Sequence, residues 1–161
     1  MTIDNSPVVI RDRKLMYILV ISLILLLSVI LISDFFEQPI FGISREFYAI
    51  TIATLYILIN AYRFFLDLNF INFSDQEGKF IIRYYSLRPF MQKHQSIEII
   101  QNTFVKYEII SKAAGLKKYL ILYQRVRNKI AKYPPLSITA LTIDELNSIL
   151  ASLNSKASTK N

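Results

Sequence analysis

"LMYILVISLILLLSVILIS", residues 15–33, is a run of nineteen uncharged residues in a chain of 161. A helix of about 20 apolar residues is long enough to cross a hydrocarbon core of ~30 Å. Most of the run is Leu, Ile or Val, and each of these favours insertion near the bilayer centre by roughly 0.3–0.6 kcal/mol. The stretch therefore predicts a membrane span.

A secretory signal is the alternative interpretation, because Arg11, Arg13 and Lys14 precede the apolar run. Signal peptides have an apolar region of about 7–15 residues, followed by a cleavage site of small residues. Here the run is longer and ends in "SDFFEQP", which lacks such a site. The sequence favours a retained span.

A second apolar stretch covers residues 47–66, "FYAITIATLYILINAYRFFL", with aromatic residues at both ends as in interfacial belts. A buried helix of a soluble core is the alternative. Ala49, Ala53 and Asn60 fall on one helical stripe, which is a candidate packing face for the first helix. Chance gives the same spacing, because Ala is common in spans. Residues 15–66 thus predict a two-helix transmembrane hairpin, with spans at about 15–33 and 47–66.

The distribution of charge predicts the orientation of this hairpin. Basic residues in short flanking segments favour the cytoplasmic side. The flank 1–14 and the segment after residue 66 are basic, whereas the connecting loop has Arg45 against three acidic residues. We expect a multi-pass protein of the cytoplasmic (inner) membrane, with both termini cytoplasmic and the short loop outside.

Residues 67–154 change to short segments with period-two alternation, separated by polar turns. They predict six or seven antiparallel strands in meander order, forming a curled sheet or partly open barrel. A C-terminal helix over 142–154 caps it, with Thr142 and Glu145 forming a capping box. Residues 155–161 are predicted to be a disordered tail.

Two stretches carry a family resemblance: "GKFIIRYYSL" followed by "QSIEII", and "PPLSITALTIDELNSILASL" near the end of the chain. With the two preceding spans, they resemble small membrane-anchored bacterial proteins that carry a pleckstrin-homology-like (PH-like) domain. The chain departs from that pattern in having no tryptophan. The resemblance implies a mainly-β fold and a membrane location, and little about activity, because such folds serve as scaffolds for many contacts.

The composition argues against catalysis. There is no cysteine, the single histidine is His94, and the three glycines are too far apart for a phosphate-binding loop. The acidic residues are accounted for by turns, outward strand positions and the helix cap. We therefore expect no enzyme activity, no cofactor, no metal site and no nucleic-acid partner.

The remaining signal is a net charge of +7. A dense basic group lies in "LKKYLILYQRVRNKIAKY", and if 119–124 and 130–133 pair as a hairpin, part of this group lies at its tip. One interpretation is binding of anionic phospholipid head groups or of a partner. The other is a solvated turn whose charge sets only topology and solubility. The candidate residues are Lys117, Lys118, Arg125, Arg127, Lys129 and Lys132.

These observations predict a non-enzymatic integral membrane protein that presents a cytoplasmic PH-like interaction module to a protein or to the anionic membrane surface. The alternative is an accessory or structural subunit of a larger membrane complex. Its partners would then be other membrane proteins or a second copy of the chain, contacted through Ala49, Ala53 and Asn60.

Overall fold

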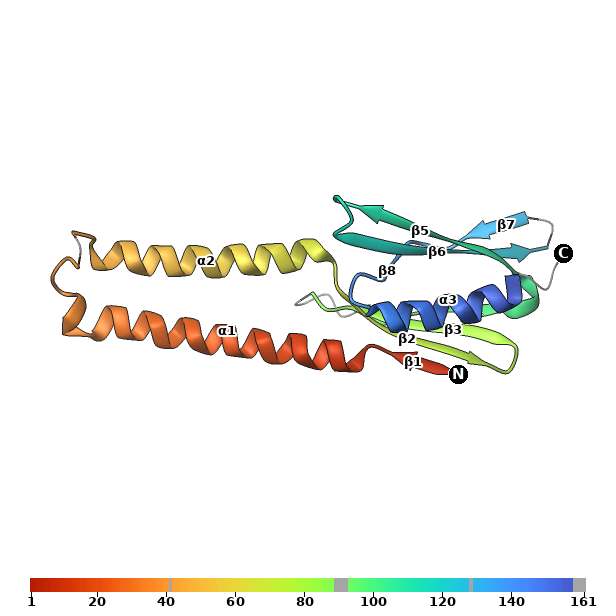
Figure 1. Ribbon diagram of the computed structural model, residues 1–161, viewed down its shortest axis with the longest axis horizontal. Coiled ribbons are helices and arrows are strands. Elements are labelled where there is room, and N and C mark those ends of the chain that lie inside the picture. The colour runs from red at the N-terminus through yellow and green to blue at the C-terminus, as the bar shows by residue number, and fades with distance from the viewer. Residues whose placement is uncertain (41, 89–92, 128, 158–161) are drawn as a thin grey trace. The chain divides into compact units, whose positions relative to one another are not determined.

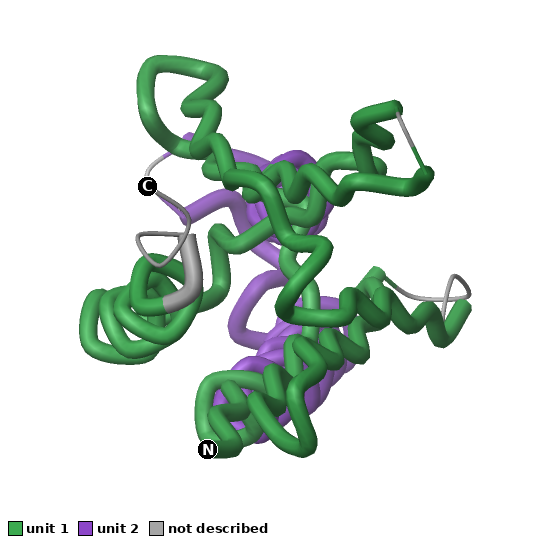
Figure 2. Tube along the Cα trace, turned by 90° about the vertical axis from the view of Figure 1, so that its right-hand side faces the viewer, with its two compact units in different colours: residues 1–9, 66–161 green, residues 10–65 purple. Residues whose placement is uncertain are grey.

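The computed structural model describes residues 1–40, 42–88, 93–127 and 129–157. The chain forms two compact units, coloured separately in Figure 2. One, the β unit, combines Met1–Val9 with Leu66–Asn161. The other, the helical unit, is Ile10–Phe65. The helical unit is therefore an insertion within the sequence of the β unit.

Two long helices account for most of residues 6–66: α1 (Ser6–Ile32) and α2 (Arg45–Leu66), with the short 3-10 helix η1 (Asp34–Phe36) between them. Both are long and apolar enough to cross a membrane. α1 begins well before the predicted span, because the Asp4 carboxylate accepts a hydrogen bond from the Ser6 amide and the polar residues that follow continue the helix. It ends one residue earlier than predicted, where the Ser33 hydroxyl caps η1.

The apolar side chains of these helices are largely uncovered. Leu25 of α1 is 60% exposed, and Ile57 of α2 is 63% exposed. None of the residues of α2, all of which the structure describes, is buried. Residues 47–66 therefore do not form a buried core helix within this chain.

The first sheet is antiparallel, in the order β1-β2-β3-β4. Its strands are β1 (Thr2–Asp4), β2 (Asn69–Gln76), β3 (Lys79–Ser86) and β4 (Gln95–Ile100). Glu77 and Gly78 join β2 to β3 with φ values of 53° and 74°, as a two-residue hairpin turn requires. Strand β1 was not predicted: it comes from the N-terminal flank and pairs with residues 72–74.

The second sheet contains β5 (Phe104–Lys112), β6 (Lys117–Val126), β7 (Lys129–Lys132) and β8 (Leu136–Ser137). β6 is the central strand, with β5 on one side and both β7 and β8 on the other. The meander prediction fails at β8, which pairs with β6 rather than β7. The single curled sheet is also divided in two, because the 3-10 helix η2 (Gln101–Thr103) separates β4 from β5.

The core lies between the inner faces of the sheets and α3 (Ile143–Ala157), which packs against β5 and β1 (Figure 1). Phe73, Phe80 and Phe104 are fully buried and in ring contact. Ile149 and Leu153 of α3 join the same cluster. The helix thus closes the side of the β unit where one edge strand of each sheet lies.

The predicted capping box is confirmed: the Thr142 amide donates to Glu145, and the Glu145 amide donates to the Thr142 hydroxyl. The helix continues to Ala157, so the first residues of the predicted tail are helical. The rest of that tail, residues 158–161, lies outside the described residues.

Candidate functional site

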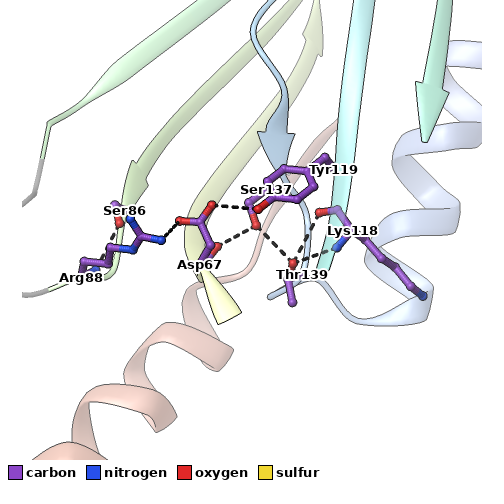
Figure 3. Close-up of polar contacts among 7 residues, drawn as sticks. All are labelled: Asp67, Ser86, Arg88, Lys118, Tyr119, Ser137 and Thr139. Carbon is purple, nitrogen blue, oxygen red and sulfur yellow. Dashed lines mark hydrogen bonds and ion pairs between the residues drawn. The ribbon is translucent and has the colours of Figure 1, made fainter. Parts of the chain in front are cut away.

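The chain leaves the β unit for α1 and returns from α2 at one end of its sheets, which we call the exit end. Asp67 lies there, directly after α2, in the left-handed conformation with φ of 54°. Figure 3 shows the polar side chains gathered around it from β3, β6 and β8. The other residues of this cluster are Ser86, Arg88, Lys118, Tyr119, Ser137 and Thr139.

Asp67 contacts two strands of the second sheet and the segment that follows β3. Its Oδ1 forms an ion pair with Arg88 Nη2 at 3.0 Å. Its Oδ2 accepts a hydrogen bond from the Tyr119 hydroxyl at 3.3 Å. Its backbone carbonyl accepts from the Ser137 hydroxyl at 2.6 Å. The first residue after α2 is therefore tied to strand β8, strand β6 and the segment that follows β3.

A second set of bonds extends this cluster toward α3. The Thr139 hydroxyl lies 3.2 Å from that of Ser137, and it accepts from the Lys118 amide at 3.1 Å. Thr139 in turn lines a cavity beside the start of α3. The cluster thus connects the chain exit with the N-terminal end of that helix.

The Tyr119 phenol has a raised pKa. Burial is the largest cause, followed by the negative charge of Asp67 and the hydrogen bond to it, while Arg88 opposes the shift. The phenol therefore stays protonated at neutral pH and donates to Asp67. This arrangement positions the chain; it is not that of an activated nucleophile, which requires a lowered pKa.

The cavity at the exit end has a volume of about 140 Å³ and is lined by residues of the β5–β6 turn, of the segment after β8 and of α3. That volume suits a few water molecules and falls below the roughly 300–1,000 Å³ of pockets for drug-sized ligands. At its mouth, Leu116 is 47% exposed and Ile143 is 77% exposed. The cavity has a mixed polar and apolar lining and is too small for a drug-sized ligand, but two exposed apolar side chains stand at its mouth.

The structure divides the predicted basic group between the two ends of β6. Lys117 and Lys118 begin the strand at the exit end, where they pair with Lys112 and Ser111 of β5. At the other end Arg125 pairs with Ile130, and Val126 pairs with Lys129. A hairpin is therefore present, but it pairs residues 123–126 with 129–132 rather than 119–124 with 130–133. We call Arg125, Arg127, Lys129 and Lys132 the tip group.

The two groups are far apart. Arg125 follows Lys118 by seven residues on one strand, which spans about 23 Å at ~3.3 Å per residue. Within the tip group, Lys132 lies over the Tyr123 ring, 6.0 Å from its centroid. Binding by either group stays a prediction, but the six residues do not form one surface.

Ala49, Ala53 and Asn60 lie on the less exposed stripe of α2, together with Tyr56. The Asn60 amide donates to the Tyr56 carbonyl at 2.9 Å, within the helix itself. A feature the sequence did not reveal ties α1 to α2: Arg63 and Asp12 form an ion pair whose side chains are 15% and 20% exposed. Packing through the alanine stripe remains a prediction.

Three structural residues were missed by the sequence reasoning. The Asn5 side chain, fully buried, donates to the Asn69 carbonyl and accepts from the Ile71 amide. Asp75, predicted as a turn residue, accepts from Gln101 and from Ser152 of α3. Asp67 could have been noticed as the first charge after the second apolar stretch; Asn5 and Asp75 have no local signal.

No group of three or more His, Cys, Asp or Glu residues that could hold a metal is found in the part of the chain that the structure describes. His94 is exposed, with its ring 4.8 Å from that of Tyr85. No family model matches the chain, and no curated protein or solved structure matches it significantly. The candidate site is therefore argued from its own geometry.

Proposed function

We propose that this chain is a non-enzymatic integral membrane protein whose α1 and α2 cross the bacterial cytoplasmic membrane as a hairpin. The hairpin holds the β unit at the cytoplasmic face as a PH-like interaction module. The observation that carries the proposal is the pairing of β1 with β2, because these strands lie on opposite sides of the hairpin in sequence.

That pairing restricts the topology. Ile3 pairs with Phe73, and Asn5 bonds to Asn69 and Ile71. A folded sheet lies on one side of a bilayer, so the chain between Asn5 and Asn69 crosses an even number of times. With two candidate spans in that interval, both cross or neither does. Cleavage of α1 as a secretory signal would remove β1 from the sheet.

The exposed apolar surface of both helices supports crossing over not crossing. Ile50, Leu55 and Ile57 of α2 are each more than half exposed, and α1 is similarly uncovered. Contiguous apolar surface of this extent is not typical of a soluble monomer. Lipid provides the apolar surroundings that these side chains lack within the chain.

Two further observations support the orientation and the module. The flanks of the hairpin are basic and its loop is not, which favours the cytoplasmic side for the β unit. Two antiparallel sheets followed by a C-terminal helix that enters the core support the PH-like assignment. Such scaffolds act through the surfaces they present rather than through a shared chemistry.

Cysteine accessibility tests this proposal cleanly, because the chain has no native cysteine. Single variants Gln38→Cys, in the loop between the helices, and Ile130→Cys, on β7, are expressed separately. A membrane-impermeant maleimide added to intact spheroplasts should label position 38 and reach position 130 only after permeabilisation. Labelling of position 130 in intact spheroplasts contradicts the topology.

A further inference from the structure

The exit end of the β unit combines exposed apolar side chains with lysines. Leu116 and Ile143 are large apolar residues at 47% and 77% exposure, and both line the mouth described above. Lys112, Lys117 and Lys118, which we call the exit lysines, lie on the strands that lead into and out of the same turn. Lys112 and Lys118 are exposed.

The backbone of the β5–β6 turn is unusual in a way that places Leu116. Ala113, Ala114 and Gly115 have φ values of 52°, 53° and 89°. Left-handed conformations in two successive alanines are disfavoured, because their Cβ atoms crowd the backbone. A strained turn that ends in an exposed leucine suggests that the leucine has a role outside the fold.

The mouth is tied to the chain exit by short bonds. Thr139 lines the mouth and lies 3.2 Å from the Ser137 hydroxyl, which donates to the Asp67 carbonyl. Asp67 follows the last residue of α2. If α2 ends at the membrane surface, Asp67 lies at that surface, and the mouth of the cavity lies close to it because Ser137 and Thr139 join the two.

We propose that the exit end rests on the anionic headgroup surface of the bilayer that holds α1 and α2, with Leu116 and Ile143 inserted and the exit lysines facing the lipid phosphates. This inference rests on the proposed function and assigns a surface and a ligand class to it. It assigns the membrane contact to the exit end of the β unit instead of to the tip group.

Distance from the chain exit favours the exit lysines over the tip group for this contact. Electrostatic attraction to a leaflet decays within a Debye length of about 8 Å at physiological salt. The tip group lies about 23 Å along β6 from Lys118 and has no short connection to Asp67 among the contacts described. Three acids are also at the exit end. Asp67 is paired with Arg88, Glu145 is bonded to the Thr142 amide, and Asp144 lies in the first turn of α3.

The test uses the full chain reconstituted into vesicles of phosphatidylcholine, with or without phosphatidylglycerol, that contain a lipid carrying a quencher at headgroup depth. An environment-sensitive fluorophore is attached at Leu116→Cys or Ile143→Cys. Ile130→Cys on β7, 58% exposed, is the matched control. Leu25→Cys in α1 reports insertion of the hairpin.

In phosphatidylglycerol vesicles the probes at 116 and 143 should be quenched and shifted to shorter wavelength, while the probe at 130 stays aqueous. Each change of an exit lysine to Glu should lower the ratio of docked to undocked β unit by about fivefold or more. Arg125→Glu and Lys129→Glu should leave that ratio unchanged.

Failure of the inference is distinguishable from failure of the proposed function. A probe at 25 that is shifted to shorter wavelength, with aqueous probes at 116 and 143, overturns the inference and leaves the hairpin intact. An aqueous probe at 25 overturns the proposed function as well. Docking that is equal with and without phosphatidylglycerol contradicts the role of the exit lysines.

Discussion

Large apolar residues are buried in the β unit and exposed in the helical unit. Phe80 and Leu120 in the β unit are 0% and 2% exposed, whereas Leu25 and Phe47 in the helical unit are 60% and 60% exposed. The β unit covers its apolar side chains with two sheets and a helix. The helical unit does not cover its own.

This contrast shows where each unit obtains its hydrophobic stabilisation. Burial from water contributes about 25 cal/mol per Å² of apolar surface. The β unit gains this from its own fold. The helical unit gains it only if lipid or another protein surrounds it, so substitutions in the two units should have very different effects on folding.

The largest expected difference is between Phe80→Ala and Leu25→Ala. Phe80 packs against Phe73 and Phe104, with ring centroids 5.9 and 5.5 Å away. Its truncation should lower the free energy of unfolding of the β unit by about 3–5 kcal/mol. Leu25→Ala should change it by less than about 0.5 kcal/mol. Pulse proteolysis in urea, on full chain in nanodiscs, measures both.

If Phe80→Ala does not fold, Ile82→Val gives the same test at smaller amplitude. Ile82 is 1% exposed, and removing one methyl group should cost about 0.5–1.5 kcal/mol. Equal losses for the core variants and for Leu25→Ala contradict the division into a self-covered unit and an uncovered one.

The next effect concerns the strand that joins the two flanks of the hairpin. Asn5→Ala leaves the Asn69 carbonyl and the Ile71 amide without their side-chain partner in a buried position. We expect a loss of about 2–3 kcal/mol in unfolding free energy, together with faster hydrogen exchange at Ile71. Asn147→Ala, on the exposed side of α3, is the control and should stay within about 0.5 kcal/mol. Unchanged exchange at Ile71 contradicts this role of Asn5.

The smallest effect is electrostatic and appears at high pH. Because the pKa of Tyr119 is raised on folding, the stability linked to its protonation is fully present below the unfolded pKa of about 10 and is lost as the pH rises through the folded pKa. Asp67→Asn should lower the pKa of Tyr119 by removing the negative charge that helps to raise it. It should change stability at neutral pH by less than about 1 kcal/mol.

An absorbance titration, subtracting Tyr119→Phe in each background, isolates this tyrosine from the others. Glu108→Gln is the control, since Glu108 bonds Lys106 and Tyr123 instead. If the titration of Tyr119 is the same in Asp67→Asn as in the unaltered chain, the charge of Asp67 does not contribute to the raised pKa of Tyr119.

Local patterns were sufficient for much of the β unit. The alternation in "QSIEII" is typical of a strand with Ile97 and Ile99 on one face, and both are buried in β4. The run of apolar residues in "YLILYQRV" is typical of a central strand, and β6 has neighbours on both sides. The capping box followed from two residues three positions apart. Each of these signals lies within a few residues of the chain.

Other features have no such local signal. β1 is three residues long, too short for alternation to be recognised, and its partner strand begins only after both helices. β8 follows β7 in sequence, yet it pairs with β6 because that strand is long enough to accept both. The basic residues near β6 were predicted as one group because they are close in sequence. The ten-residue strand β6 places some of them at one end and the rest at the other.

The sequence by itself determined two apolar stretches of membrane-spanning length, the strand segments and the helix cap, because each depends on periodicity or on neighbouring residues. Only the tertiary structure decided that the flank before α1 belongs to the β unit, and that Asp67 joins the chain exit to β6, β8 and the segment after β3. These contacts join residues about 70 positions apart, such as Asp67 with Ser137 and Ile3 with Phe73, and their free energy arises only once the sheets have formed.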